Sequence, residues 1–90
     1  MGLFWKHRIS DSISMRPAGR DVVEYRDGDR LMEINAERLG GNPRRIVYTS
    51  SIARWLPPHE HETLDADARE QILENVLKCF KMNGVSVVTG

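Results

Sequence analysis

The sequence predicts an α+β fold. We expect an antiparallel β-meander of four to five strands, one C-terminal α-helix packed on one of its faces, and a closing strand. Residues 20–50 are rich in β-branched and aromatic runs separated by turn residues. Residues 63–83 carry an apolar stripe at helical spacing, and residues 85–89 form a short β-branched run. Because one helix cannot bury such a stripe alone, it has to lie across the apolar face of the strands.

The length of the chain sets the outer bounds of the fold. Its 90 residues, 40% hydrophobic and 29% charged, are typical of one small globular domain over residues 1–90. Such a domain has room for a two-layer core but not for a deep enclosed active site as well. Residues 1–19 are expected to be an N-terminal extension or a weak first strand, since Ile13 and Met15 alternate with polar residues before Pro17.

A β-hairpin is expected next, over residues 21–34. The Asp27-Gly28 pair is typical of a type I′ turn, which would place Arg26 opposite Asp29 and Val23 opposite Met32. One face of this hairpin would be apolar, with Val23, Tyr25, Met32, Ile34 and Ala36. The other face would be polar, with Glu24, Arg26, Glu33 and Asn35.

The segment that follows predicts a loop, a strand and a helical turn. The paired glycines in residues 39–43 indicate a hairpin loop rather than a phosphate cradle, because no Lys-Ser/Thr and no helix follow them. Residues 45–50 are typical of a strand. Ile52 and Trp55 are three residues apart, which favours a single helical turn packed on the core.

The helix has clear start and stop signals. Thr63 is the expected N-cap, and Asn83-Gly84 supplies a left-handed stop. The apolar stripe consists of Ile72, Leu73, Val76, Leu77 and Phe80. Residues 85–89 then close the chain as a strand.

Charge and composition narrow the class of partner. The net charge is zero, yet residues 1–55 carry ten Lys/Arg against seven Asp/Glu, and residues 56–90 carry three against six. This distribution is either an ordinary solvated surface or a bipolar surface that steers a charged partner. It gives no support to sequence-independent nucleic-acid binding, and no apolar run approaches the ~20 residues of a membrane span. With the single cysteine, Cys79, these features predict a cytoplasmic protein with neither nucleic-acid nor membrane partners.

Histidines and carboxylates concentrate in one loop. His59 and His61 are two residues apart, with Glu60 and Glu62 between and after them. Two histidines and a carboxylate can ligate zinc, but a structural zinc site takes four ligands. Cys79 lies about 24 Å away along the helix at 1.5 Å per residue. We therefore expect no metal and no cofactor, and a metal-binding loop remains the minor alternative.

Catalytic residues are not indicated. Cys79 flanks the apolar stripe, which is typical of a small buried hydrophobe rather than a nucleophile. The three serines Ser10, Ser12 and Ser14 alternate along the first strand and form its polar side. The sequence therefore predicts a protein that is not an enzyme.

Binding of a protein partner is the remaining function class. Trp55 is expected either to seal the core or to anchor an interface, where tryptophan is enriched. Pro57-Pro58 would hold the following loop extended and pre-ordered, reducing the entropy lost on binding. Phe4 and Trp5 are a second aromatic pair in the N-terminal tail. The predicted partner-binding residues are Trp55, His59, Glu60, His61 and Glu62.

A family resemblance supports this interpretation. The order of a strand meander, then Tyr48-x-x-Ser51-Ile52-x-x-Trp55-x-x-Pro58, then a helix containing Gln71-Ile72-Leu73-Glu74-Asn75-Val76, resembles small bacterial immunity proteins of polymorphic toxin systems. The resemblance covers about residues 20–89. It implies a non-catalytic binder that neutralises a cognate toxin by occluding its active site, often through acidic residues that face a basic cleft.

Within that resemblance, Trp55 would anchor the interface while Glu60 and Glu62 present charge, extended by Asp65 and Asp67. The polar outer face of the sheet is a second candidate surface. The main alternative function is a small homodimeric structural or regulatory domain that pairs through an open sheet edge or the N-terminal aromatics.

Overall fold

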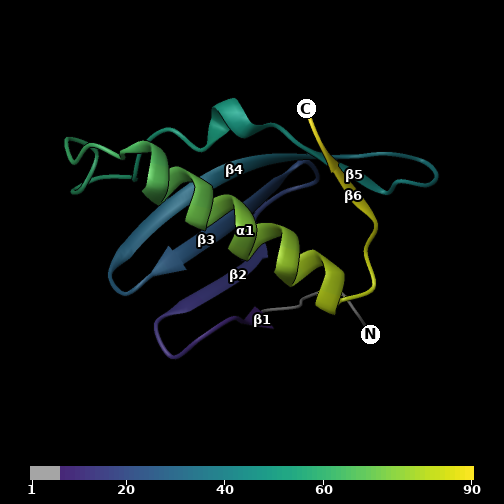
Figure 1. Cartoon of the computed structure of the whole chain (residues 1–90), viewed down its shortest axis with the longest axis horizontal. Helices are drawn as coiled ribbons and strands as arrows, with labels where there is room; N and C mark the ends of the chain where they lie inside the picture. Colours follow the sequence, from purple (N-terminus) through teal and green to yellow (C-terminus); the bar gives the residue numbers. More distant parts are fainter. Residues whose placement is uncertain (1–6) are drawn as a thin grey trace.

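The fold consists of a twisted sheet with one helix lying across it (Figure 1). The structure is a computed structural model that describes residues 7–90, with side chains from residue 9 onward. The strands are β1 (His7–Arg8), β2 (Ile13–Pro17), β3 (Val22–Asp27), β4 (Arg30–Arg38), β5 (Arg45–Val47) and β6 (Val87–Thr89). A 3₁₀ turn η1 (Thr49–Ser51) follows β5, and helix α1 (Ala66–Met82) precedes β6.

The strands of the described residues form one six-stranded sheet in the order β1-β2-β3-β4-β5-β6. Neighbours are antiparallel from β1 to β5, and β6 is parallel to β5. The predicted fold class, an antiparallel meander of four to five strands with one helix on one face and a closing strand, is confirmed. The parallel pairing follows from α1, because parallel neighbours need a crossover of a dozen or more residues.

Residues 7–19 contain more structure than the sequence indicated. β2 pairs with β3, and the short β1 pairs with β2 after a turn in which the Ile9 amide donates to the Ile13 carbonyl at 2.8 Å. Met15 on β2 is 1% exposed and so belongs to the core. The aromatic pair Phe4 and Trp5 lies outside the described residues.

The hairpin of β3 and β4 has the predicted faces but not the predicted register. Asp27 pairs with Arg30, so the two turn residues are Gly28 and Asp29. Gly28 has φ of 64°, and no described non-glycine residue has positive φ, a combination typical of a type II′ turn. The predicted type I′ turn would have required Asp27 itself to adopt positive φ.

The register error left the faces of the hairpin unchanged. The predicted pair Val23–Met32 is replaced by Val23–Ile34 and Tyr25–Met32, a shift of two residues. Because side chains alternate with period two, only an odd shift exchanges the faces of a strand. All five predicted apolar residues are buried: Val23, Tyr25, Met32, Ile34 and Ala36.

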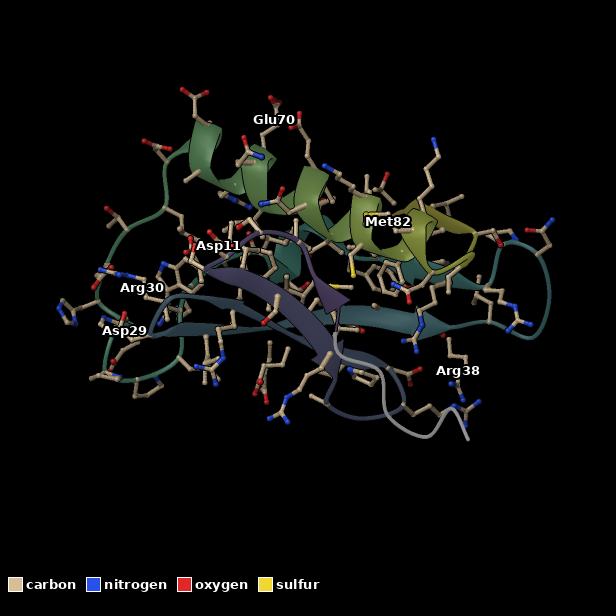
Figure 2. All side chains as sticks on the ribbon, turned by 90° about the horizontal axis from the view of Figure 1, so that it is seen from below. Asp11, Asp29, Arg30, Arg38, Glu70 and Met82 are labelled. Carbon is tan, nitrogen blue, oxygen red and sulfur yellow. The ribbon has the colours of Figure 1, made fainter. Side chains whose placement is uncertain are left out.

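Helix α1 covers that apolar face, and Figure 2 shows it as a layer on one side of the sheet. Ile72, Val76 and Phe80 of the predicted stripe are buried, as is Cys79. Leu73 and Leu77 pack against the same core while half-buried. A polar link joins the layers, since the Asn75 amide nitrogen donates to the Tyr25 hydroxyl at 2.9 Å.

Both ends of α1 are capped. The N-cap is Asp65, whose carboxylate accepts from the Ala68 amide at 2.7 Å, and not Thr63 as predicted. At the C-terminus, Val85 N–H donates to the Phe80 carbonyl at 2.9 Å and Gly84 N–H donates to the Lys81 carbonyl at 3.0 Å. These two bonds form a Schellman motif, with φ of 72° at Gly84.

The strand predicted over residues 45–50 ends at Val47. The Ser51 hydroxyl donates to the Tyr48 carbonyl at 2.6 Å and accepts from the Asn35 amide at 2.9 Å. These side-chain hydrogen bonds replace the backbone hydrogen bonds of the β-sheet, and the chain turns into η1. The helical turn therefore precedes Ile52, whereas the sequence predicted it to include Ile52 and Trp55.

Candidate functional site

The candidate site is the loop that connects η1 to α1, at the far end of the molecule from the turn between β4 and β5 (Figure 1). The Leu56 amide donates to the Leu31 carbonyl on β4 at 2.7 Å, which ties the start of the loop to the sheet. His59 N–H then donates to Leu56 O, and Glu62 N–H donates to His59 O, each at 3.0 Å. The loop thus folds into two consecutive turns and is not extended as predicted.

An ion network fixes the loop against the turn between β3 and β4. Arg30 donates from Nε to Glu62 Oε1 at 2.7 Å and from Nη2 to Glu62 Oε2 at 3.1 Å. His59 Nδ1 lies 2.8 Å from the same carboxylate, and His59 Nε2 lies 3.6 Å from Asp29 Oδ2. The bidentate arginine–carboxylate pair is the strong geometry for such contacts, so Glu62 fastens the loop to the sheet.

The electrostatics of Glu62 follow from this network. Hydrogen bonds from Arg30 first, and from His59 second, lower the pKa of the Glu62 carboxyl to about 2. The carboxyl is therefore ionised at neutral pH and can only accept, so His59 Nδ1 is the donor in their contact. The negative charge of Glu62 is matched within the protein by Arg30.

The predicted partner-binding residues have different environments. Trp55 is only 6% exposed, and its ring lies 6.3 Å from that of Tyr25, so it packs in the core. His59 is half-buried in the ion network, whereas Glu60 and His61 are exposed. The structure thus brings His59 and Glu62 together, places Glu60 and His61 toward solvent, and buries Trp55 in the core.

Sequence reasoning missed Arg30 and Asp29 as residues of this site. Arg30 lies 32 positions before Glu62, and no spacing or motif connects the two. The Asp27-Gly28 turn signal was the one available indication, because it placed a charged turn at the end of the hairpin.

Acidic side chains surround the exposed part of the loop. Asp29 is 78% exposed at its side chain, and Asp65 and Asp67 are exposed around the start of α1. Together with Glu60 they make this end of the molecule acidic. Figure 2 shows Asp29 and Arg30 at this end, and Arg38 and Met82 at the opposite one.

Residues 7–90 contain neither a candidate metal site nor a reactive thiol. No group of three or more His, Cys, Asp or Glu in this part of the chain is arranged to hold a metal ion. Cys79 is fully buried, and burial raises the pKa of its thiol to about 11, so it remains protonated at neutral pH. No helix in the described part of the chain is long and apolar enough to span a membrane.

The outer face of the sheet, the second candidate surface, is open in the described structure. Arg16 and Glu24 form an ion pair across β2 and β3 at 2.8 Å. A shallow pocket of about 420 Å³ lies beside β4, lined by residues that include Glu33 and Asn35. This face therefore carries both signs of charge.

Comparison with known proteins identifies the family. The family model of Immunity protein 74 matches residues 17–89, which include β3 through β6 and the whole connecting loop. Searches of curated proteins and of solved structures gave no match. The chain therefore belongs to the Immunity protein 74 family, a family of non-catalytic toxin inhibitors.

Proposed function

We propose that this protein neutralises a cognate bacterial toxin in the cytoplasm by covering the toxin's active site with the loop of residues 59–62. Glu60 and His61 provide the contacting side chains. His59 and Glu62 hold the loop in place, and Trp55 supports it from the core. The observation that carries the proposal is that this loop is fastened at Glu62 while Glu60, two residues before it, is exposed.

Rigidity of the loop favours binding. Two backbone turns, the bond from Leu56 to Leu31 and the paired Arg30–Glu62 contacts fix the loop before a partner arrives. A pre-ordered loop loses less conformational entropy on association than a free one, so more of the contact energy contributes to affinity.

The charge of the loop end supports a basic partner surface. Glu60 on the loop, Asp29 in the turn between β3 and β4, and Asp67 in the first turn of α1 are all exposed. The charge of Glu62, in contrast, is matched by Arg30. An acidic surface of this kind accelerates encounter with a basic cleft and disfavours partners of like charge.

The test uses a single charge reversal. Wild-type protein is used to capture partners from a lysate of the source cell, and the captured toxin domain is then purified for titration. Glu60→Lys is expected to weaken its binding at least about tenfold, because removal of an interfacial charge contact typically costs more than about 1.4 kcal/mol. Wild type should also suppress the toxin's activity, and Glu60→Lys should suppress it less.

Glu33→Lys is the matched control. Glu33 is an exposed glutamate on β4 at the outer face of the sheet, so the charge change is identical and the surface is different. Equal loss in both variants would point to a general effect of net charge. Loss in Glu33→Lys alone would move the interface to the outer face, and recovery of this protein alone would favour the homodimer.

A further inference from the structure

A basic pocket lies at the other end of the molecule, between the turn of β4 and β5 and the last turn of α1. Its volume is about 390 Å³, and it is lined by Arg38, Leu39, Arg44, Arg45, Phe80 and Val85. Phe80 lies fourteen residues after the first residue of α1, which places the pocket about 21 Å along the helix axis from the start of α1. It is therefore separate from the loop of residues 59–62.

The pocket is built around a buried arginine. Arg45 is 7% exposed, and its guanidinium carbon lies 5.7 Å from the centre of the Phe80 ring. Its Nη1 donates to the Ala36 carbonyl at 2.7 Å and to the Arg20 carbonyl at 3.3 Å. Its Nε and Nη2 have no hydrogen-bond partner in the described residues, although an arginine carries five N–H donors.

The positive charge of the pocket is not balanced by an ion pair. Arg38, Arg44 and Arg45 form no ion pair with a carboxylate of the described residues. Asp21 acts on Arg45 electrostatically, but its carboxylate accepts instead from the Arg38 backbone amide at 2.8 Å. Burial, and next the charge of Arg38, lower the pKa of Arg45, as expected for like charges held together away from water.

Local structure positions each of these side chains. Arg38 and Arg45 are paired residues of β4 and β5, so they flank the turn between the strands. The Arg44 amide donates to Ser86 O at 2.9 Å, which holds the turn against the chain leading into β6. The Schellman motif at the end of α1 brings Val85 back onto Phe80 and so forms the apolar wall.

We propose that this pocket binds the carboxylate of an acidic side chain, flanked by apolar residues, on a protein partner. A guanidinium recognises a carboxylate through paired N–H donors, and the free Nε and Nη2 of Arg45 provide such a pair. Leu39 and Val85, both half-buried, give the neighbouring apolar groups a surface to contact.

A carboxylate fits the molecule better than nucleic acid. The three arginines of the pocket lie at one end of the molecule, and the opposite end carries Glu60, Asp65 and Asp67. A polyanion needs a continuous basic track and would be repelled there. The inference concerns a different end of the molecule from the proposed toxin contact and does not rest on it.

The test is an NMR titration of backbone amides with the peptide acetyl-Leu-Glu-Leu-amide. Saturable shifts are expected at Leu39, Arg44 and Val85. The isosteric peptide acetyl-Leu-Gln-Leu-amide should bind at least about tenfold more weakly, because its neutral amide cannot form the charge-assisted hydrogen bonds that a carboxylate forms with a guanidinium. Inorganic phosphate and a ten-residue oligothymidylate are titrated in parallel.

Two variants test whether peptide binding depends on the pocket or only on the net charge of the protein. Arg38→Gln/Arg44→Gln changes two exposed side chains and should weaken the Glu peptide about tenfold with the fold intact, as checked by amide spectra. Arg54→Gln, an exposed arginine outside the pocket, should leave binding unchanged. The proposal is overturned by equal binding of the Glu and Gln peptides, by the absence of saturation, or by tighter pocket binding of phosphate or oligonucleotide.

Discussion

Glu62 shows how one side chain changes what a loop offers to a partner. From the sequence, it was one of two equivalent glutamates that present charge. In the structure its carboxylate is held by two hydrogen bonds from Arg30 and lies against His59, whereas Glu60 is exposed. The two residues therefore have different roles, one in holding the loop and one in presenting charge.

The contact between Glu62 and Arg30 is sensitive to acid, because it depends on the ionised form of Glu62. Its folded-state pKa of about 2 is below the ordinary value of 4.5, so the ionised form stabilises the fold. This stabilisation is complete above the unfolded value and is lost as pH falls toward about 2. We expect the gap in free energy of unfolding between wild type and Glu62→Gln to shrink over that range, measured by urea denaturation.

Glu60→Gln is the control for this experiment, since it removes an exposed carboxyl from the same loop. Its gap from wild type should change little as the pH falls. A gap for Glu62→Gln that stays constant between neutral and acid pH would show that the Arg30 contact does not stabilise the fold.

Helix α1 shows where an element was predicted well and where it was not. The stripe Ile72, Val76 and Phe80 and the stop at Gly84 follow from local periodicity and backbone freedom, and they are confirmed. The predicted N-cap, Thr63, lies two residues before the observed N-cap, Asp65. Both residue types are good caps, and the path of the loop decides which side chain accepts from the free amides of the first helical turn.

The corrected cap predicts different effects of two similar substitutions. Asp65→Ala removes the bond to the Ala68 amide and should lower the free energy of unfolding by about 1 kcal/mol. Thr63→Ala, outside the helix, should change it by less than about 0.5 kcal/mol. Urea denaturation of both variants measures the difference, and a larger effect from Thr63→Ala would restore the original assignment.

At the scale of the whole molecule, Trp55 joins the sheet to the segment that leads into the loop. It is buried beside Tyr25, which in turn accepts from Asn75 on α1. We expect Trp55→Ala to lower the free energy of unfolding by about 3–5 kcal/mol, since a large side chain leaves a cavity. Trp55→Phe should lose less, and Arg54→Ala, exposed beside it, should be near neutral.

Stability and binding measurements together define the role of Trp55. A stable Trp55→Ala variant that binds the toxin domain poorly would make this residue an interface anchor instead. Loss of both stability and binding, with Trp55→Phe retaining both, is the result that its burial predicts.

Charge is organised over the whole molecule as well. The excess of acidic residues after position 55 noted in the sequence corresponds to exposed carboxylates on the loop and at the start of α1. Arg38, Arg44 and Arg45 lie near the end of α1, where Figure 2 labels Arg38. The helix runs between these ends, and its dipole has the matching direction, with acidic residues at its start.

The sequence by itself determined the main hairpin with its two faces, the helix with its apolar stripe, and the closing strand, because period and turn chemistry act over a few residues. Only the tertiary structure decided the hairpin register, the folded turns of the loop and the partnership of Arg30 with Glu62. It also decided the pocket around Arg45, and it placed Trp55 in the core. These features depend on contacts between residues far apart in the chain, and no local pattern encodes such contacts.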